Sequence, residues 1–209
     1  MNEKELRSLM ADLGASLFMR GFSVGGAGNL SCRLPDGSIL ATPTNSCLGR
    51  LDPGELSIAD TNGRHVSGAP PTKELPLHLA VYTARPHCAA VAHLHSTYAT
   101  ALSCRADLDA ANALSPFTPY YVMRIGQLPV VPYHRPGSPA LARNAGVAAA
   151  TAPAFLLANH GAVACGASLT EAVNNAEELE ETVKLHIILE ASGVPVRHLT
   201  PGEVAELQG

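Results

Sequence analysis

The sequence predicts a single layered α/β domain, and three observations support this fold class. Segments with apolar residues at helical spacing alternate with short apolar runs that are typical of buried strands. The chain has 209 residues, a length that suits one domain spanning residues 1–209. Apolar residues make up 46% of the chain and charged residues only 15%, so a packed core is possible. That core must be aliphatic and rich in Ala, because Trp is absent and aromatic residues are few.

The elements of the N-terminal half are predicted from apolar spacing and turn residues. Residues 4–20 carry apolar side chains at helical spacing and end at Gly21. A glycine-rich segment at 25–31 forms a tight turn into a strand, and residues 38–43 form another short strand. A polar stretch with Gly and Pro then continues to about Pro71. The next predicted elements are a helix over 75–84, a buried strand over 88–95 and a short helix over 98–104.

The C-terminal half contains one segment, residues 107–128, in which several prolines prevent an assignment. A long helix is predicted after Ser168, whose side chain can cap it together with Glu171 three positions later. The elements between these two regions are a strand over 130–133, an Ala-rich helix over 139–150 and two short strands within 154–166.

Charge and composition exclude several classes of protein. The net charge of −4, with no clustered basic residues, argues against nucleic-acid or anionic-membrane binding, although an anionic substrate is compatible with a local cation. No segment approaches the roughly 20 apolar residues of a membrane span, and the N-terminus lacks the apolar run of a signal peptide. The five cysteines include no CxxC pair, which suggests reduced thiols. We therefore expect a soluble cytoplasmic protein.

Four residues in separate segments suggest a metal site. His93 and His95 end an apolar strand, where alternation places both imidazoles on one face. His160 lies in a turn beside Gly161, and Glu74 begins a helix. Taken singly, these residues are explained as core histidines, a turn histidine and a helix N-terminal acid. Together, three imidazoles and one carboxylate suit a divalent cation, Zn²⁺ first.

A second group of residues suggests a phosphate site. Its members combine backbone N–H groups in glycine-containing turns with hydroxyl, amide and ammonium donors, which are suitable partners for an anion. Each turn or loop alone is weak evidence, because such segments are usually only turns. The candidate phosphate-binding residues are Asn29, Thr44, Asn45, Thr72 and Lys73.

The order of these motifs resembles that of the class II aldolase/adducin family over residues 4–192. The resemblance implies a three-layer α/β/α domain with a mainly antiparallel central sheet. It also implies a homotetramer of fourfold symmetry with active sites at subunit interfaces. The motifs that carry it are Gly28-Asn29-Leu30-Ser31, Thr42-Pro43-Thr44, Thr72-Lys73-Glu74 with His78, His93-Leu94-His95-Ser96 and Asn159-His160-Gly161.

The resemblance also implies a role for each residue of the metal group. His93, His95 and His160 are expected to bind one zinc ion per subunit. Glu74 is expected to be a further ligand in the resting enzyme and the acid/base during turnover. Tyr120 matches a tyrosine that family members send into the site of a neighbouring subunit as a proton donor.

Two alternatives remain open for that tyrosine. Its neighbour Tyr121 matches almost equally well, and packing at an interface explains either residue without chemistry. Three other histidines have simpler explanations. We expect His78 to pack on its helix or to support the site from behind, His134 to be a loop residue and His186 to be a cation near a helix C-terminus.

Within the family, the resemblance favours a subgroup that decarboxylates 3-oxo-tetronate 4-phosphate to dihydroxyacetone phosphate and CO₂. The segments 95–103, 114–123 and 176–181 carry this likeness, and the reaction implied passes through a metal-stabilised enediolate. Sugar-phosphate aldolases usually have two serines where this chain has Thr72 and Lys73, and epimerases have Asp where it has Glu74.

Three alternatives to the decarboxylase remain. An aldolase or a pentulose-phosphate 4-epimerase would use the same metal site. A non-catalytic adducin-like binding module is less favoured, because it would be expected to have lost metal ligands. A purely structural zinc site would usually be closed and rich in Cys, and no Cys joins this set.

Overall fold

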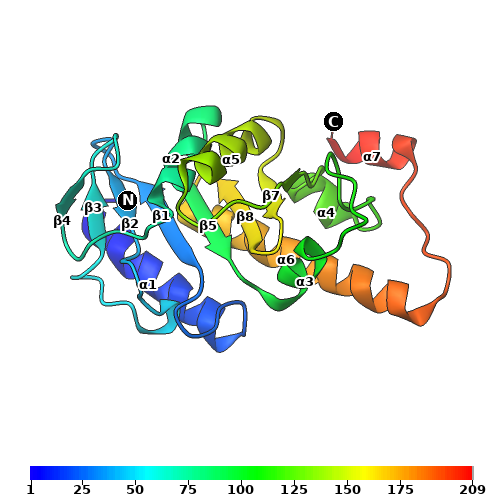
Figure 1. Ribbon diagram of the computed structural model, residues 1–209, viewed down its shortest axis with the longest axis horizontal. Helices are drawn as coiled ribbons and strands as arrows, with labels where there is room; N and C mark the ends of the chain where they lie inside the picture. The colour runs from blue at the N-terminus through cyan, green and yellow to red at the C-terminus, as the bar shows by residue number, and fades with distance from the viewer. Residues whose placement is uncertain (209) are drawn as a thin grey trace.

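A single eight-stranded sheet forms the centre of the protein (Figure 1). The computed structural model describes residues 1–208. The strand order is β4-β3-β2-β1-β5-β8-β7-β6, and every neighbouring pair is antiparallel except β6 and β7. The strands are β1 (Asn29–Arg33), β2 (Ile39–Ala41), β3 (Ser57–Ala59), β4 (His65–Ser67), β5 (Ala90–Leu94), β6 (Val130–Val131), β7 (Ala154–Leu157) and β8 (Gly161–Gly166).

Helices cover both faces of this sheet, so the domain has three layers (Figure 1). One buried cluster joins the sheet to α2 and α5, and the other joins its opposite face to α1, α3, α4 and α6. The mainly antiparallel α/β/α architecture expected for the family is therefore confirmed. The helices are α1 (Glu3–Met19), α2 (Leu75–Ala84), α3 (Thr97–Ser103), α4 (Pro119–Arg124), α5 (Pro139–Thr151), α6 (Leu169–Ser192) and α7 (Pro201–Gln208), with a 3₁₀ turn at Leu48–Arg50.

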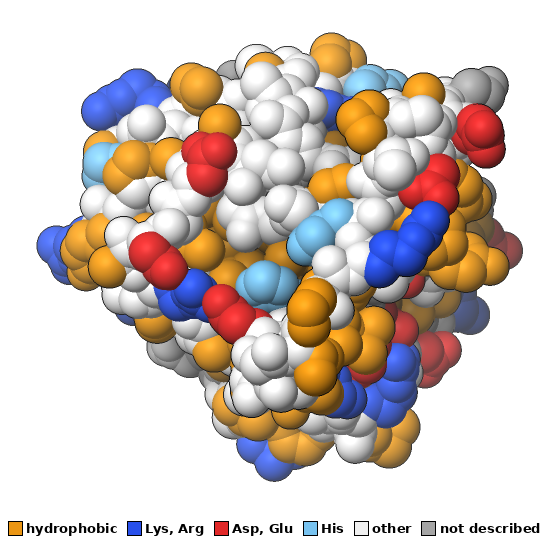
Figure 2. Space-filling model, turned by 90° about the vertical axis from the view of Figure 1, so that its right-hand side faces the viewer, with side chains coloured by type: hydrophobic (Ala, Val, Ile, Leu, Met, Phe, Trp, Pro, Cys, Tyr) orange, Lys and Arg blue, Asp and Glu red, His pale blue; other side chains and the backbone are white. Residues whose placement is uncertain are grey.

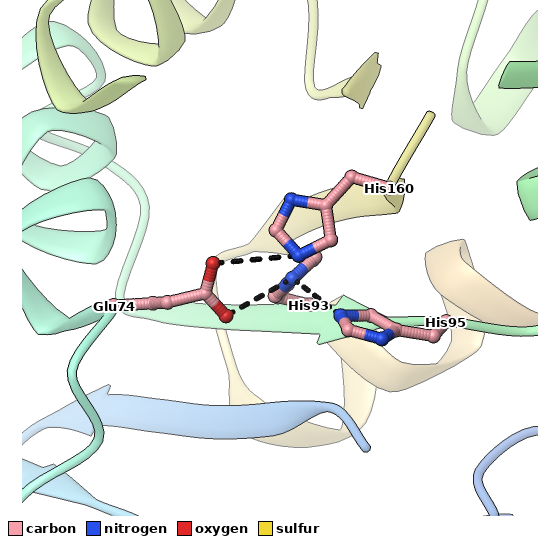
Figure 3. A group of neighbouring side chains, drawn as sticks. All are labelled: Glu74, His93, His95 and His160. Atoms are coloured by element: carbon pink, nitrogen blue, oxygen red, sulfur yellow. Dashed lines mark hydrogen bonds and ion pairs between the residues drawn. The ribbon is translucent and has the colours of Figure 1, made fainter. Parts of the chain in front are cut away.

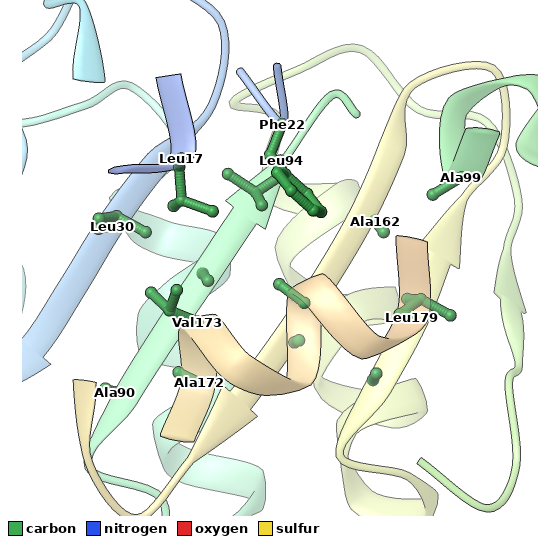
Figure 4. Packing of buried hydrophobic residues seen from close by; sticks show 14 of the residues in the cluster. Leu17, Phe22, Leu30, Ala90, Leu94, Ala99, Ala162, Ala172, Val173 and Leu179 are labelled. Carbon is green, nitrogen blue, oxygen red and sulfur yellow. The ribbon is translucent and has the colours of Figure 1, made fainter. Parts of the chain in front are cut away.

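The long helix α6 packs against the middle of the sheet through small and branched side chains (Figure 4). Ala172 and Val173 on the helix meet a sheet surface that includes Ala90 and Ala162, and all four are buried. Small residues on both sides let the helix axis lie close to the strands. The predicted cap is present, because Ser168 Oγ accepts a hydrogen bond from the backbone N–H at position 171 over 3.1 Å.

Most of the predicted elements are present, and those missed are short. The helix predicted over 75–84 has these same bounds as α2, and the predicted strand at 130–133 is reduced to β6. The polar stretch before Pro71 contains β3 and β4, each only three residues long. The proline-rich segment 107–128 contains α4, which Thr118 caps. The helix α7 lies in a region for which the sequence predicts no element.

Two properties inferred from composition can be compared with the structure. No helix within residues 1–208 has the length and apolar character needed to cross a bilayer. All five cysteines lie in this described range, and they are free thiols.

Candidate metal centre and substrate cavity

The structure brings Glu74, His93, His95 and His160 together at one end of the central strands (Figure 3). One potential ligand atom from each residue lies within 4.8 Å of the others. His93 is in β5, His95 follows directly after that strand, His160 lies in the β7–β8 turn and Glu74 immediately precedes α2. Four segments distant in sequence therefore meet at a single point.

The β7–β8 turn approaches β5 closely because residue 161 is a glycine. A Cβ atom at Gly161 would lie 2.4 Å from the Leu94 carbonyl oxygen, and the residue has a φ of 154°. Asn159 also has a positive φ, 57°, in the left-handed region that Asn tolerates better than most residues. This tight turn places the imidazole of His160 against those of His93 and His95.

The imidazole rings face each other with their Nε2 atoms directed inward. The three ring centroids are separated by 4.7–4.8 Å. His93 Nδ1 lies 2.9 Å from the Ala162 carbonyl oxygen, which can only accept, so Nδ1 carries the hydrogen. This hydrogen bond fixes the ring orientation, as backbone carbonyls commonly do behind metal-binding histidines. His93 Nε2 then lies 3.1 Å from His95 Nε2.

These four residues fit a divalent cation. Two imidazole nitrogens facing each other at 3.1 Å are an unfavourable pair unless a proton or a cation lies between them. Glu74 Oε1 is buried and has no hydrogen-bond partner, although it lies 3.5 Å from His160 Nε2. Three imidazoles and a carboxylate match the ligand types that Zn²⁺ prefers.

Within the cluster, the carboxylate of Glu74 favours a proton on His93. Burial lowers the pKa of His93, but its hydrogen bond and charge interaction with Glu74, 3.2 Å away, outweigh burial and raise it. For Glu74, burial favours a higher pKa, yet the hydrogen bond and charge of His93, with His160 and Asn29, hold that pKa well below its usual range. The carboxylate is therefore ionised and available as a ligand.

The other two imidazoles remain neutral. Burial, reinforced by the nearby charge of His93, lowers the pKa of His95 to about 3 and that of His160 to about 4. Neutral imidazole is the form that binds metal ions. The site therefore offers two free Nε2 lone pairs, those of His95 and His160, to a cation.

A cavity of about 230 Å³ opens beside the cluster. Its lining includes two loops held side by side, since the Thr44 N–H bonds to the Pro70 carbonyl and the Thr72 N–H to the Thr42 carbonyl. Figure 2 shows the end of the molecule formed by α7 and the C-terminal part of α6, where hydrophobic side chains lie among histidine, acidic and basic groups. The cavity is lined by Gly26, Gly28, Asn29, Pro43, Thr44, Thr72, Lys73, Glu74, His95, Pro136 and His160.

The structure places four of the five candidate phosphate-binding residues in this cavity. Thr44, Thr72 and the exposed Lys73 line it, whereas Asn45 is exposed and does not belong to the lining. Asn29 also lines it, but its side-chain amide already donates to Glu74 Oε2 over 3.0 Å. Its position follows from pairing of β1 with β5, which sets Asn29 opposite His93.

The two candidate tyrosines have very different surroundings. Tyr120 is 60% exposed, while Tyr121 is fully buried and donates its hydroxyl hydrogen to the Leu114 carbonyl oxygen over 3.2 Å. Burial raises the pKa of Tyr121. Neither lines the cavity of the same chain. Of the pair, Tyr120 is therefore the one available to a neighbouring molecule.

Glu180 supports the metal centre and was not identified from the sequence as a site residue. This buried α6 carboxylate accepts hydrogen bonds from Ser96 Oγ and from the backbone N–H groups of Tyr98 and Ala99, over 2.7–2.8 Å. It therefore caps the first turn of α3, which begins two residues after His95. Its burial could have been predicted from the sequence, because the apolar residues Ala176 and Val183, both buried, flank it at helical spacing.

The remaining histidines differ in their surroundings. His78 is fully buried in α2 and bonded to two polar side chains. His134 lies in a loop, 3.1 Å from Asn144 Nδ2. The expectation for His186 is wrong, because α6 continues to Ser192 without a basic residue in its last turn. Burial also lowers the pKa of His186, which disfavours its charged form.

The fold and the metal cluster together define a class II aldolase-like protein, and comparison with known families agrees. The chain belongs to the family described as class II aldolase and adducin N-terminal domain, whose model matches residues 8–187. The family expected from the sequence motifs is thereby confirmed.

Individual members of the family are also similar to this chain. The chain is 55% identical to 3-oxo-tetronate 4-phosphate decarboxylase from Escherichia coli (strain K12), with 99% of this chain and 96% of the relative covered. L-fuculose phosphate aldolase from the same strain is 31% identical, with 98% and 93% covered. The crystal structure of YgbL from Escherichia coli is similar with a TM-score of 0.96 at 54% identity, with 99% of each chain covered.

Proposed function

We propose that this protein is a metal-dependent carbon–carbon lyase that decarboxylates 3-oxo-tetronate 4-phosphate to dihydroxyacetone phosphate and CO₂. The observation that carries the proposal is the glutamate–trihistidine cluster beside a cavity that also contains Lys73. The 55% identity to a relative named for this activity supports the choice of reaction and substrate.

We propose Zn²⁺ as the cation, one per subunit, held by His93, His95 and His160, with Glu74 as a further ligand in the resting state. When bound, the cation supplies a Lewis acid that stabilises negative charge developing on the ketone oxygen of the substrate. The imidazole nitrogens already face one another in the arrangement that a shared cation requires.

Glu74 is the proposed acid/base of the reaction. Loss of CO₂ from a 3-oxo acid leaves an electron pair at the former C2, and a proton must be delivered there to complete the product. Glu74 lines the cavity, and its Oε1 has no hydrogen-bond partner. Its pKa must rise on substrate binding for it to carry that proton, as happens when a carboxylate loses positively charged partners or becomes more desolvated.

The phosphate is assigned to the part of the cavity lined by Thr44, Thr72 and Lys73. Lys73 supplies a positive charge there, and Thr44 and Thr72 supply hydroxyl donors. Binding the phosphate fixes the substrate at a distance from its reacting bond, so that binding energy can align the scissile C–C bond perpendicular to the carbonyl plane. The same proposal includes Asn29, which lines the cavity, and Asn45, which follows Thr44, as further phosphate contacts.

We propose a homotetramer in which Tyr120 reaches the site of a neighbouring subunit as a second proton donor. The support is the exposure of large apolar side chains that a partner subunit would cover. Those that are more than half exposed in and beyond the middle of the chain are Tyr120, Met123, Tyr133, Val147, Ile188 and Val194.

The direct test is a zinc-loaded assay with 3-oxo-tetronate 4-phosphate that follows CO₂ and dihydroxyacetone phosphate together. We expect equal amounts of both products, lost on adding a chelator and restored by zinc. Failure of folded, metal-loaded protein to release CO₂ would reject the decarboxylase.

A class II aldolase is the second candidate, because the chain is also 31% identical to an L-fuculose phosphate aldolase. The two reactions differ in the group that leaves. Incubation with L-fuculose 1-phosphate would release an aldehyde if the protein is an aldolase, and conversion of a pentulose phosphate to its 4-epimer would indicate an epimerase. A non-catalytic adducin-like module would convert neither substrate.

A further inference from the structure

A chain of buried side-chain hydrogen bonds connects Tyr82 to Glu74 from behind the metal centre. The Tyr82 hydroxyl and His78 Nδ1 each lie 2.7 Å from Ser31 Oγ. On the other side of the ring, His78 Nε2 lies 2.6 Å from Asn29 Oδ1, and Asn29 Nδ2 donates to Glu74 Oε2 over 3.0 Å. The four residues behind Glu74 are at most 6% exposed.

The residues of this hydrogen-bond chain come from two secondary-structure elements, and their spacing follows the periodicity of each element. His78 and Tyr82 are four residues apart on α2, so they lie on the same side of the helix. Asn29 and Ser31 are two residues apart on β1, so they point to the same face of the strand. The polar side chains of one element therefore meet those of the other at the boundary between α2 and the sheet.

The hydrogen bonds of this chain have one consistent direction. The ionised Glu74 accepts only, so the Asn29 amide must turn its Nδ2 to Glu74 and its Oδ1 to His78. His78 must then carry its hydrogen on Nε2. The ring is fully buried and neither of its nitrogens faces a carboxylate, which favours the neutral form, so Nδ1 accepts from Ser31. The Ser31 oxygen in turn accepts from Tyr82.

The orientation of the Asn29 amide decides which oxygen of Glu74 is free. Oε2 receives the Asn29 N–H and lies 3.2 Å from His93 Nε2, whereas Oε1 has no hydrogen-bond partner. If the amide turned over, its oxygen would face the Oε2 atom of the carboxylate, and the two acceptors would repel. The N–H of His78 holds the amide in the same orientation from the other side, because it can pair only with the amide oxygen.

We propose that His78 is a positioning residue that locks the Asn29 amide, and that Glu74 thereby presents Oε1 as the oxygen that carries the proton. His78 does not line the cavity, so it acts through Asn29 and not on the substrate. The inference rests on the proposed acid/base role of Glu74. It adds a histidine outside the metal set and assigns separate tasks to the two carboxylate oxygens.

The test compares His78→Leu with His78→Gln in zinc-loaded protein. Leu removes both hydrogen bonds, and we expect kcat to fall by about 10- to 100-fold, the usual range for residues that orient groups of a metal site. KM should change by less than about threefold, because no substrate contact is lost. Gln can donate to Asn29 and accept from Ser31, and we expect it to restore most of kcat. Equal losses in both variants would overturn the proposal.

A second pair of variants covers the case in which His78→Leu fails to fold. Ser31→Ala deletes the donor to Nδ1, together with the acceptor of the Tyr82 hydroxyl, and should lower kcat without loss of zinc. Cys32→Ala, the matched control, alters the next residue of β1, which belongs to the core cluster on the opposite face of the sheet. An unchanged kcat in Ser31→Ala would contradict the inference, as would a matching loss in Cys32→Ala.

A spectroscopic measurement separates this inference from the proposed reaction. In histidine-labelled protein, the ¹⁵N shifts of His78 should report a neutral ring with hydrogen on Nε2 at pH 7, and Ser31→Ala should weaken that preference. This readout needs no turnover, so it remains informative if the decarboxylase assay fails. A ring protonated on Nδ1, or on both nitrogens, would overturn the assigned direction of the chain.

Discussion

At the scale of single residues, the candidate centre is a set of four side chains that are inexplicable as ordinary core residues. Three rings place Nε2 atoms toward a shared point, and the acid beside them has an unpaired buried oxygen. Burying such groups is costly unless each finds a partner. A bound cation would provide that partner for all four residues at once.

Replacing one imidazole should therefore remove the metal. We expect His95→Ala to weaken zinc affinity by at least about 100-fold, because even residues behind a metal ligand are worth 10- to 100-fold. Activity should be lost in proportion to bound zinc. Metal content after dialysis, measured with turnover, checks this, and His134→Ala serves as a control, since His134 lies in a loop and does not line the cavity. One full equivalent of zinc with normal turnover in His95→Ala would contradict the assignment.

Removing the charge of Glu74 should affect the chemistry more than the metal. Glu74→Gln keeps the side-chain shape and three imidazole ligands, but the amide cannot transfer a proton. We expect kcat to fall by about 10²- to 10⁴-fold, the usual contribution of a general acid or base. Glu55→Gln, at an exposed acid outside the cavity lining, should leave kcat unchanged. If Glu74→Gln turns over at the normal rate, Glu74 has no part in the reaction.

At the scale of elements, the site depends on a capping interaction between two helices. Glu180 in α6 accepts three hydrogen bonds at the start of α3, directly after His95. In Glu180→Gln, one acceptor oxygen becomes an NH₂ group that faces donors. We expect a loss of about 1.5–3 kcal/mol in the free energy of unfolding, the range for hydrogen bonds to charged groups.

Urea unfolding would measure this loss, with zinc affinity as the companion readout. The matched control is Glu181→Gln at the next position. The Glu181 carboxylate is exposed and forms a surface ion pair with Lys184 over 3.4 Å. Its stability should change by less than about 1 kcal/mol, as for other surface ion pairs. Equal effects of the two substitutions would show that Glu180 does not support the site.

The same scale separates what the sequence could predict from what it could not. Alternation in a strand was enough to place His93 and His95 on one face, and α2 was predicted with correct bounds because its apolar pattern is strong. Elements of only a few residues, such as β4 and α4, bury too little to leave a pattern.

Contacts between residues far apart in the sequence are the other feature that the sequence could not predict. The contact of Glu180 with α3, and that of His78 with Asn29, arise only when elements far apart in sequence pack together. The buried position of Glu180 could be read from helical spacing, but its partners could not. The sequence likewise left Tyr120 and Tyr121 unresolved, and only the burial of the second separates them.

At the scale of the whole molecule, the buried histidine His78 links stability to pH. Its folded pKa of about 3 lies below the ordinary value near 6.5, so the unfolded chain binds a proton that the folded chain rejects. Stability therefore rises with pH through this interval, is fully present above about pH 6.5 and is lost progressively as pH falls toward the folded pKa. Between pH 7.0 and 5.5, this one group should cost about 1 kcal/mol.

Comparison of the wild type with His78→Gln isolates this contribution. Urea unfolding of chelator-treated protein at pH 7.0 and 5.5 gives the pH-dependent loss for each, and the variant should lose about 1 kcal/mol less than the wild type because Gln does not titrate. His95 and His160 also have lowered pKa values, and His93 a raised one, but they are present in both proteins and cancel in the difference. Equal losses would mean that His78 is protonated as readily in the folded protein as in the unfolded chain. That outcome would also remove the neutral ring on which the hydrogen-bond direction from Tyr82 to Glu74 depends.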